Sequence, residues 1–582
     1  MSDVTLKING VEVSVPKGTT VLNAANAAGI EIPTLCYLRE VNAIASCRMC
    51  VVEIKGKRGL TASCVAPAEE GMEILTHTPT VRKSRKQSLE LLLSDHDKKC
   101  LSCVRSTNCE LQALSQEYSC DENRFKTAQS ETLRYELDES SPYLIRDNNK
   151  CILCRRCVAA CKVVESVGAI GAIDRGHGTH IGCAFERDTM DSPCIGCGQC
   201  IVACPTGALR EKSNINEAWE ALEDPKKKVV MFTAPSVRAQ LGEAFDLPIG
   251  TNVEGKMVAA SKLLGFEEVF NMDVTADLTI VEEANELVQR VTTGGVLPMF
   301  TSCCPGWVKY LEHNYPEMIP HVSSCKSPQQ MFGAVLKSYY AEKNNMNPDD
   351  LVVVSCIPCT AKKFEIGREE QNWRDNPDVD IALTTRELAQ MIKQAAIKFN
   401  NLADVEFDNP FGVASGGGTI FGATGGVMEA AIRTAGRLLD PSFDKIEIEE
   451  VRGTRGIKEA TYKMGDTEVS VAVCSGLANA RKVIEMVKSG KKKYHMIEVM
   501  ACPGGCVNGG GQIIPRDHVR NYEDVKTLRA KALYHIDANV SEYRTCESTP
   551  IMNALYKDYF GEPGKGKAHK ILHTTYVKRD KL

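Results

Sequence analysis

The sequence lacks a long apolar run, an excess of charge of one sign and an export signal. No stretch of about 18 or more apolar residues occurs, so no conventional transmembrane helix is expected. Lys and Arg number 70 against 75 Asp and Glu, and the formal charge of −5 offers no basic surface for nucleic acid or anionic membrane. The opening residues, MSDVTLKINGVEV, lack the charged and then apolar segments of a signal peptide. We therefore expect a cytoplasmic protein with neither nucleic acid nor membrane as a partner.

Cysteine is the residue that the sequence has in excess, with 26 among 582 residues. In a small secreted protein this content indicates a disulfide framework, but clustered cysteines in a large chain without an export signal more often bind metal. The apolar fraction of 43% and the charged fraction of 25% are ordinary for globular proteins. The length predicts about four domains.

The first part of the chain predicts three small domains. Residues 1–80 are β-rich, because two alternating strands flank an Asn-Gly turn and a short helix follows that ends at Gly29. Residues 81–127 are predicted to be helical around a cysteine group. A polar stretch then leads into a cysteine-dense domain, which we place at residues 128–210.

Residues 211–582 are predicted to form one large α/β domain, with the main boundary near residues 210–228. Short apolar runs alternate with helical patterns, which indicates a largely parallel sheet. Three of the runs end in cysteine, at the sheet edge where α/β folds usually place their chemistry. The predicted strands are residues 229–235, 296–303, 351–359 and 494–502, and the predicted helices are residues 275–291, 385–399 and 478–488.

Two cysteine runs in the third domain have the spacing CxxCxxCxxxC, and the second run is followed by proline. This is the bacterial two-cluster ferredoxin pattern, in which the fourth cysteine of each run ligates the other cluster. Zinc sites are the alternative, but these use CxxC pairs rather than four-cysteine runs. The first predicted cluster takes Cys151, Cys154, Cys157 and Cys204, and the second takes Cys194, Cys197, Cys200 and Cys161.

Two further cysteine groups lie upstream of these runs. The group in the β-rich domain is spaced like the ligands of a ferredoxin-type [2Fe–2S] cluster, the alternative being unrelated buried thiols: Cys36, Cys47, Cys50 and Cys64. The next group has three cysteines with a histidine nearby, and imidazole can replace thiolate on iron: His96, Cys100, Cys103 and Cys109. Taken alone, His96 reads as a solvated surface histidine.

The large domain carries three cysteine motifs, FTSCCPGW, CIPCTAKKFE and EVMACPGGCVNGGG. Their candidate cluster ligands are Cys304, Cys359, Cys502 and Cys506. Cys502 and Cys506 are spaced i,i+4, which places both thiolates on one face if the segment is helical. The flanking glycines allow the backbone to approach a bulky ligand closely. Cys303 directly precedes Cys304, so its thiol should diverge from the cluster and is available to carry a proton.

Together, these three motifs behind the cluster array resemble the iron-only ([FeFe]) hydrogenases, specifically the long clostridial type with four accessory clusters, over essentially the whole chain. The resemblance implies reversible reduction of protons to H₂ at an H-cluster. This cofactor is a [4Fe–4S] cubane joined through one cysteine to a two-iron unit that carries CO, cyanide and an azadithiolate. The resemblance assigns the cubane to the four candidate ligands above, with Cys506 as the bridge. It also implies that His96 ligates one of the three accessory [4Fe–4S] clusters.

The expected fold is therefore multidomain α/β and α+β. It comprises a β-grasp ferredoxin-like N-terminal domain, a helical domain with the His/Cys cluster, a bacterial two-cluster ferredoxin-like domain and a large α/β catalytic H-cluster domain.

The predicted helix at residues 275–291 carries acidic residues beside its apolar face. At about 100° per residue, Glu283 and Arg290 fall next to that face, and Glu286 lies further round on the same side. Alone, this pattern reads as a solvated acidic face. The resemblance instead implies a proton path, which we expect to run through Arg290, Glu283, Ser323, Glu286 and Cys303 to the cluster.

The resemblance also implies the residues around the two-iron unit. Lys362 should hydrogen-bond a cyanide ligand, and Ile357 stands where well-known members carry methionine. The other expected pocket residues are Ala234, Pro235, Ser236, Gln329, Phe421 and Met500. A glycine-rich stretch at residues 415–431 lacks the Gly-Lys-Ser/Thr ending of a nucleotide loop, and we interpret it as close backbone packing.

Ferredoxin or flavodoxin is the implied electron partner, H₂ and protons are the substrates, and maturation proteins supply the two-iron unit.

The sequence leaves two alternative functions to weigh against a hydrogenase. The first 210 residues also resemble the cluster-bearing subunit of respiratory NADH dehydrogenase, which would transfer electrons without H₂ chemistry, but the three motifs argue against it. A hydrogen-sensing relative is the second, and the presence of Cys303 argues against it.

A few positions depart from the family pattern. Cys325 stands where well-known members have alanine, Cys356 is an additional thiol near the motif, and Ile513 follows Gln512 where they have proline. We expect Cys325 and Ile357 to alter the environment of the active site.

Overall fold

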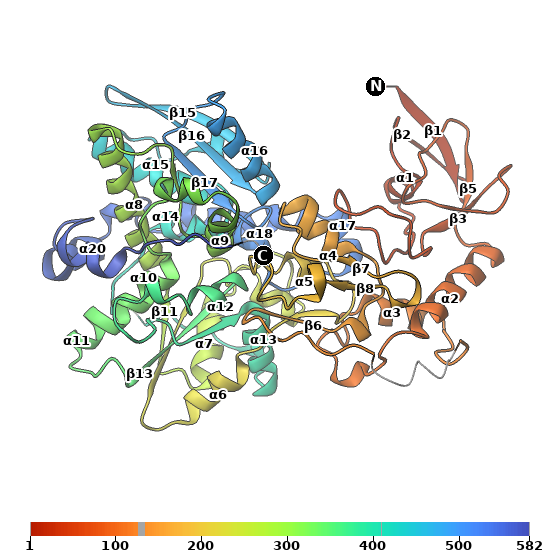
Figure 1. Cartoon of the computed structure of the whole chain (residues 1–582), viewed down its shortest axis with the longest axis horizontal. Coiled ribbons are helices and arrows are strands. Elements are labelled where there is room, and N and C mark those ends of the chain that lie inside the picture. The colour runs from red at the N-terminus through yellow and green to blue at the C-terminus, as the bar shows by residue number, and fades with distance from the viewer. Residues whose placement is uncertain (1, 126–133, 409, 581–582) are drawn as a thin grey trace.

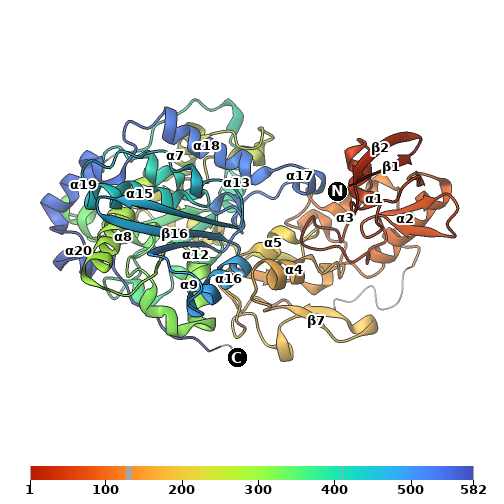
Figure 2. The ribbon, with the colours of Figure 1, turned by 90° about the horizontal axis from the view of Figure 1, so that it is seen from above.

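The computed structural model describes residues 2–125, 134–408 and 410–580. The molecule is elongated, with the N-terminal sheet at one end, the large domain at the other and the cysteine-rich segments between them (Figures 1 and 2). Part of the predicted polar stretch after residue 125 lies outside the described residues. Within the described ranges, no helix combines the length and the apolar character needed to cross a membrane.

The N-terminal domain is a five-stranded sheet with the strand order β2-β1-β5-β3-β4. The predicted hairpin is confirmed: β1 (Asp3–Ile8) pairs antiparallel with β2 (Val11–Pro16), and both residues of the Asn-Gly turn have positive φ. The helix α1 (Val21–Ala27) follows, capped by the Thr20 hydroxyl. Buried side chains of α1 and of the sheet share one core, as expected for a β-grasp domain. The remaining strands are β3 (Val51–Ile54), β4 (Leu60–Ala62) and β5 (Glu73–Leu75).

Two short segments connect this sheet to the large domain. The first contains α2 (Pro79–Leu93) and α3 (Glu110–Glu117), as the predicted helical character of residues 81–127 requires. The second is closed by the antiparallel pair β6 (Leu144–Arg146) and β9 (Leu209–Glu211). Its other elements are α4 (Arg156–Ala159), α5 (Gln199–Ala203) and the hairpin of β7 (Gly171–Ile173) and β8 (His180–Gly182).

The large domain contains two four-stranded sheets. The first is fully parallel in the order β11-β10-β13-β14, with β10 (Lys228–Thr233), β11 (Glu268–Asn271), β13 (Leu351–Ile357) and β14 (Ile381–Thr384). The second has the order β12-β17-β16-β15, with β12 (Met299–Phe300), β15 (Ile457–Met464), β16 (Thr467–Ser475) and β17 (Met496–Met500). Only β15 runs antiparallel to its neighbour, so the largely parallel arrangement is confirmed.

Helices cover both faces of the second sheet. Alternate residues of β16 belong to two different cores: Val471 and Val473 pack with α8 (Asp273–Thr293) and α15 (Gly426–Leu439). Ala472 and Cys474 pack with α9 (Pro305–Asn314) and α16 (Leu477–Lys488). This alternation is what a strand buried on both faces produces.

Three sequence predictions need adjustment. The strand expected at residues 296–303 shortens to β12, because Pro298 cannot donate a backbone hydrogen bond. The helix expected at residues 385–399 ends earlier, as α13 (Thr385–Gln394). The boundary near residues 210–228 holds a helix, α6 (Ile215–Glu223), whose Ile215 and Ala218 pack into the core of the large domain.

The glycine-rich stretch at residues 415–431 packs closely, as predicted. A Cβ atom at Gly422 would lie 3.1 Å from the Cβ of Ser236, and one at Gly417 would lie 2.8 Å from the sulfur of Cys546. Side chains at these positions would separate α14 (Gly416–Thr419) and the following turn from their neighbours.

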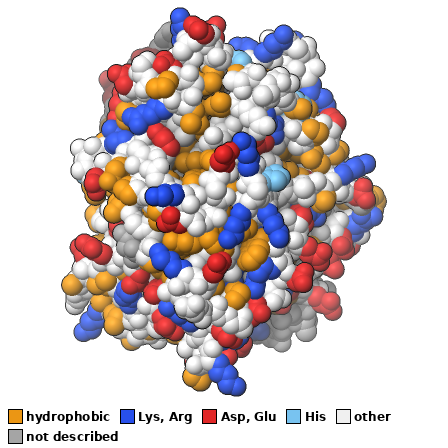
Figure 3. Space-filling view, turned by 90° about the vertical axis from the view of Figure 1, so that its left-hand side faces the viewer, with side chains coloured by type: hydrophobic (Ala, Val, Ile, Leu, Met, Phe, Trp, Pro, Cys, Tyr) orange, Lys and Arg blue, Asp and Glu red, His pale blue; other side chains and the backbone are white. Residues whose placement is uncertain are grey.

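Helices near the C-terminus lie on the large domain and at its junction with the cysteine-rich segments (Figures 1 and 2). They are α17 (Asp517–Tyr522), α18 (Val525–Asn539), α19 (Pro550–Leu555) and α20 (Gly566–Leu572). On the face of the large domain that points away from the N-terminal sheet, acidic and basic side chains are interspersed without a dominant sign (Figure 3). This pattern agrees with the small net charge.

Candidate functional site

A cavity lies where strands of both sheets end. Its walls come from the segments that follow β10, β12, β13 and β17, so the carboxyl ends of four parallel strands meet there. This is the edge where open α/β sheets bind their ligands. Five cysteines line the cavity: Cys303, Cys304, Cys359, Cys502 and Cys506. The three sequence motifs are therefore brought together around one space.

The segment between Cys502 and Cys506 is not an α-helix, so the condition for an i,i+4 arrangement of the two thiols is not met. Gly504 and Gly505 have φ values of 87° and 93°, which reverse the chain between the two cysteines. Cys506 then begins a short 3₁₀ turn, Cys506–Asn508. Both thiols reach the cavity because the backbone turns, and a Cβ at Gly505 would lie 2.6 Å from the backbone nitrogen of Thr424.

Lys362 supplies a positive charge at the cavity wall. The residue is buried, and its Nζ donates to the Ser327 hydroxyl at 3.0 Å and to the Glu365 carboxylate at 2.9 Å. Burial lowers the pKa of Lys362, but the Glu365 carboxylate outweighs this and the net pKa is raised. The ammonium therefore stays charged and is held in one place.

Most of the expected pocket residues line the cavity, but two do not. Ala234, Pro235, Ser236, Phe421 and Met500 are lining residues. Among the described residues, neither Gln329 nor Ile357 belongs to the lining. Gln329 donates to Glu365 at 2.9 Å behind the lysine, and Ile357 is fully buried at the end of β13. The expected contacts of these two residues with the two-iron unit therefore stay predictions.

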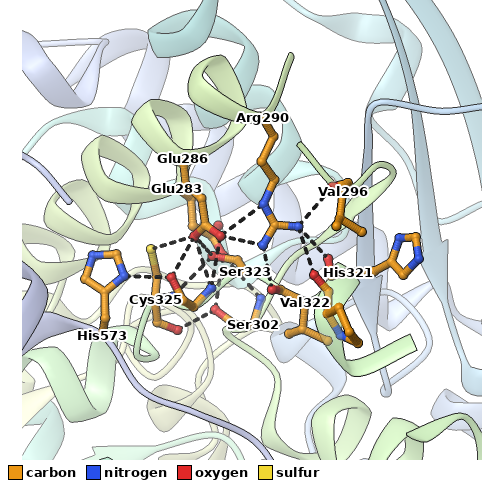
Figure 4. A network of polar contacts seen from close by, with 12 residues as sticks. Glu283, Glu286, Arg290, Val296, Ser302, His321, Val322, Ser323, Cys325 and His573 are labelled. Atoms are coloured by element: carbon orange, nitrogen blue, oxygen red, sulfur yellow. Dashed lines mark hydrogen bonds and ion pairs between the residues drawn. The ribbon is translucent and has the colours of Figure 1, made fainter. Parts of the chain in front are cut away.

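A network of polar side chains connects α8 with the segments around residues 302 and 323 (Figure 4). Arg290 donates to Glu286 at 2.5 Å, and the Ser323 hydroxyl donates to the same carboxylate at 3.1 Å. The Ser323 hydroxyl also lowers the pKa of Glu283, as a polar group close to that carboxyl does. Glu283 in turn accepts from the backbone of Ser302, the residue before Cys303, at 3.2 Å.

These contacts differ in order from the expected path. Arg290 and Ser323 both contact Glu286, whereas Glu283 contacts Ser302, the neighbour of Cys303, so the two glutamates exchange the places expected from the sequence. The reason is the direction of α8. Met272, just before the helix begins, lines the cavity, and each later residue lies about 1.5 Å further along the axis.

Burial sets the protonation of two members of this chain. It raises the pKa of Glu283 to about 7, and the negative charge of Glu286 adds to the effect. One oxygen of Glu283 has no hydrogen-bond partner among the described residues. Burial also raises the pKa of Cys303 well above its ordinary value, with the charge of Glu283 contributing. At neutral pH, Glu283 therefore lies near the midpoint of its titration and Cys303 holds its proton, which suits groups that exchange protons.

The paired cysteine runs of the third domain surround two separate cavities. One is lined by Cys151, Cys154, Cys157 and Cys204, and the other is lined by Cys161, Cys194, Cys197 and Cys200. The fourth cysteine of each run crosses to the other set, which is the grouping that the spacing predicts. A [4Fe–4S] cluster fits each set of four thiols.

The two N-terminal groups lie before these runs. Cys47 lowers the pKa of Cys36, and Cys64 lowers the pKa of Cys50, so the thiols of the first group lie close together in pairs near β3. In the next group, the Nδ1 atom of His96 is buried and has no partner among the described residues. Burial lowers the pKa of His96 to about 4. A neutral, unpaired and buried imidazole nitrogen suits a metal ligand better than a solvated surface histidine.

The second ferredoxin-type cavity abuts the large cavity. Gln199 donates to the backbone of Asn508 at 2.8 Å, and Thr360 donates to Gly196 at 2.6 Å. A Cβ atom at Gly510 would lie 2.6 Å from the Cα atom of Gly198. The glycine pair therefore lets the loop after Cys506 touch the loop of the CxxCxxCxxxC run.

Family models match most of the chain. Residues 227–510 match the model of the iron only hydrogenase large subunit, C-terminal domain, and residues 523–579 match the iron hydrogenase small subunit. NADP-reducing hydrogenase subunit HndD of Solidesulfovibrio fructosivorans is 45% identical, with 100% of both chains covered. Iron hydrogenase 1 of Clostridium pasteurianum is 43% identical over 99% of this chain and 100% of that protein. The chain belongs to the iron-only hydrogenase family.

The upstream segments of this hydrogenase match cluster-binding models. Residues 2–79 match a 2Fe-2S iron-sulfur cluster binding domain. Residues 85–124 match the NADH-ubiquinone oxidoreductase-G iron-sulfur binding region, and residues 141–210 match the ferredoxin-like domain of NADH-quinone oxidoreductase subunit 3. The resemblance to a respiratory subunit is therefore confirmed for the upstream iron–sulfur domains. It does not extend to the catalytic domain.

A solved structure agrees with this assignment. Apo [FeFe]-hydrogenase HydA1 from Chlamydomonas reinhardtii, in a variant form, superposes with a TM-score of 0.57 at 39% identity, covering 63% of this chain and 99% of that chain. As a member of this family, the chain is a hydrogenase that interconverts H₂ with protons and electrons, and it carries iron–sulfur clusters and an H-cluster domain.

Some residues around the proton path were not predicted from the sequence of this hydrogenase. The Ser302 hydroxyl contacts Glu283 at 3.1 Å, and Ser324 and His573 extend the network beyond Glu286. For Ser302, the sequence offered one signal, its position directly before Cys303 in the cysteine motif. His573 gave none, because it lies 249 positions from its partner Ser324 in the chain.

Proposed function

We propose that this hydrogenase catalyses 2H⁺ + 2e⁻ ⇌ H₂ with electrons exchanged through ferredoxin or flavodoxin. The observation that carries the proposal is the convergence of five cysteines and Lys362 on one cavity at the strand ends. Two four-cysteine cavities lie on the side of the chain that leads away from it. This arrangement gives electrons a route that is separate from the polar chain on α8.

We assign the H-cluster cubane to Cys304, Cys359, Cys502 and Cys506, with Cys506 as the bridging ligand. When bound, the H-cluster supplies the redox chemistry and the making and breaking of the H–H bond. The charge of Lys362 suits an anionic ligand such as cyanide. The apolar side chains of Phe421 and Met500 keep water from the cavity.

The accessory clusters follow from the other cysteine groups. One [2Fe–2S] cluster is assigned to the four cysteines around β3, and two [4Fe–4S] clusters are assigned to the paired cavities. A third [4Fe–4S] cluster is assigned to His96, Cys100, Cys103 and Cys109, because the unpaired Nδ1 atom of His96 is the donor that iron would complete.

Protons would move along the corrected path. Arg290 holds Glu286 at the outer end, Ser323 joins the two glutamates, and Glu283 passes the proton toward Cys303. The thiol of Cys303 faces the cavity and exchanges the proton there. Each step uses a group that can both donate and accept a proton once it titrates.

The electron partner has one specific alternative. One relative that matches along its full length is named as a subunit of an NADP-reducing hydrogenase, so another subunit could deliver electrons to the same N-terminal clusters. We place the protein in the cytoplasm, where a reducing environment keeps thiols available for cluster assembly. Maturation proteins are the further partners that we propose, because the two-iron unit must be supplied to the chain.

Anaerobically matured protein is expected to evolve H₂ from reduced ferredoxin and from reduced viologen. Protein loaded with iron–sulfur clusters but not exposed to maturation proteins is the control, and it should accept electrons without producing H₂. Gas chromatography of the headspace measures both. Electron uptake without H₂ from the matured protein would leave only the electron-transfer alternative. H₂ from viologen but not from ferredoxin or flavodoxin would contradict the proposed partner alone.

A further inference from the structure

We propose that this hydrogenase binds a zinc-class divalent cation at Glu286, Cys325 and His573, beside the proton path. One ligand atom from each of these residues lies within 4.8 Å of the other two. The sulfur of Cys325 lies 3.8 Å from Oε2 of Glu286. Zn²⁺ favours sulfur, imidazole and carboxylate ligands at about 2.0–2.3 Å, which places ligand atoms about 3.5 Å from one another. Small shifts of these side chains therefore bring all three onto one ion.

The orientation of His573 supports a metal ligand. Its Nε2 atom lies 3.0 Å from the carboxylate of Glu282. Glu282 is fully buried and is fixed by the Tyr556 hydroxyl and the Gly564 backbone, each at 2.6 Å. An Nε2–H that donates to this carboxylate leaves the lone pair on Nδ1, which faces Ser324 and Glu286. Zinc-bound histidines are typically held in this way by a carboxylate on the other ring nitrogen.

The backbone holds Cys325 and His573 side by side, and the Ser324 backbone N–H donates to Glu286 at 3.0 Å. Cys325 and His573 form an isolated antiparallel bridge, Lys326 donates to Leu572 at 2.9 Å, and Thr574 donates to Ser324 at 2.8 Å. Figure 4 shows Cys325 and His573 approaching Glu286 from the side opposite Arg290. A cation at this position would keep the Arg290 contact to the other carboxylate oxygen, Oε1. The site is therefore assembled before a metal arrives.

Metal binding would exchange one proton for the ion. Burial, with the nearby carboxylates, raises the pKa of Cys325 well above its ordinary value, so the metal displaces the thiol proton to solvent. The fourth position of a tetrahedral ion is open to water or to the Ser324 hydroxyl, which is 2.8 Å from Nδ1 of His573.

The cation would also interrupt proton transfer. Oε2 of Glu286, the atom nearest Cys325, accepts from the Ser323 hydroxyl. A metal on this oxygen takes the lone pair that the proton needs and repels an incoming positive charge. This consequence rests on the proposed path through Glu286, whereas the binding site itself does not.

The test uses holoenzyme with all clusters loaded, incubated with Zn²⁺ and dialysed. We expect a zinc anomalous diffraction peak among the three residues, and one zinc per chain that Cys325→Ala and His573→Gln each lose. His180→Gln is the matched control, because it removes a histidine from another group of three possible ligands, in which Asp174 and Glu186 are exposed. Unchanged visible spectra of the clusters show that the variants are folded. Zinc retained in both site variants, or a peak elsewhere, would overturn the proposal.

Activity separates binding from its consequence. Zn²⁺ should lower H₂ evolution at least tenfold, and Cys325→Ala should raise the half-inhibiting zinc concentration at least tenfold, each rate being normalised to that variant without zinc. Mg²⁺, which prefers oxygen ligands in octahedral geometry, should not inhibit. Zinc bound at the site with an unchanged rate would support the site and contradict the proton path through Glu286.

Discussion

Replacing Cys303 with alanine is expected to lower H₂ evolution by about 10²- to 10⁴-fold, the contribution typical of a positioned proton-transfer group. Cys303 is buried, lines the cavity and follows Ser302, whose backbone and hydroxyl both contact Glu283. It is the last group of the polar chain that reaches the cavity. Serine at this position should restore little, because its hydroxyl is a much weaker acid than a thiol.

The control is Cys474→Ala, which removes a fully buried thiol on β16 that does not line the cavity. Both variants should contain the same iron per chain as the unsubstituted enzyme. Rates per loaded enzyme, measured with reduced viologen, then report proton delivery alone. A Cys303→Ala enzyme that keeps full turnover would show that protons reach the cavity by another route.

Replacing Glu283 with glutamine is expected to cost a similar factor, because an amide cannot release and regain a proton. The pKa of about 7 makes the direction of the pH dependence specific. H₂ evolution needs the protonated carboxyl as donor, so its rate should fall as the pH rises above about 7. H₂ oxidation needs the carboxylate as acceptor, so its rate should fall as the pH decreases below that value. Both dependences should disappear in Glu283→Gln.

Stability provides an independent measurement on the same residue. Burial raises the pKa of Glu283 from 4.5 to about 7, so between these pH values the folded protein holds a proton that the unfolded chain has released. The free energy of unfolding should therefore fall with rising pH across this window, by on the order of a few kcal/mol. Glu283→Gln removes this dependence and should leave the protein at least as stable above pH 7.

Asp277→Asn is the matched control for this pair of experiments. Asp277 lies on the same helix, is fully buried and also has a pKa raised by burial to about 7, but its hydrogen bonds go to Ser415. It should change stability without removing turnover per loaded enzyme. Equal losses of turnover in Asp277→Asn and Glu283→Gln would indicate that any buried charge change on α8 is harmful, and would contradict a specific relay.

Cysteine spacing predicted how most of the cysteines of the upstream domains are grouped. The two CxxCxxCxxxC runs anticipated which four thiols share each cavity, since such short loops leave few other arrangements. The N-terminal hairpin was equally accessible, because an Asn-Gly turn between alternating strands depends on local conformation alone. The cysteine groups and the hairpin each depend on residues that lie close together in the sequence, so one sequence is enough to predict them.

Features that depend on position along an element were harder to predict. The helical pattern correctly placed Glu283 and Glu286 near one face of α8, but an angle around the axis does not say which residue lies nearer the cavity. The order of the two glutamates depends on how far along the axis of α8 each one lies from the cavity, and only the structure shows this. The spacing of Cys502 and Cys506 suggested a helix, whereas Gly504 and Gly505 reverse the chain between them.

Contacts between distant segments could not be predicted from one sequence. His573 meets Ser324 across 249 positions, and Gly510 meets the Gly198 loop of another domain. Neither pair leaves a periodic or spaced pattern in the chain. Gln329 and Ile357 were expected near the cofactor from the family pattern alone; both are buried, and neither belongs to the described lining of the cavity.

Infrared spectroscopy of the anaerobically matured protein tests most directly whether the five-cysteine cavity holds an H-cluster. We expect absorption bands of CO and cyanide ligands that shift when H₂ replaces argon, and we expect them to be absent from protein that has not met the maturation proteins. Matured protein with a full complement of iron–sulfur clusters but without such bands would contradict the assignment of hydrogen chemistry to this cavity.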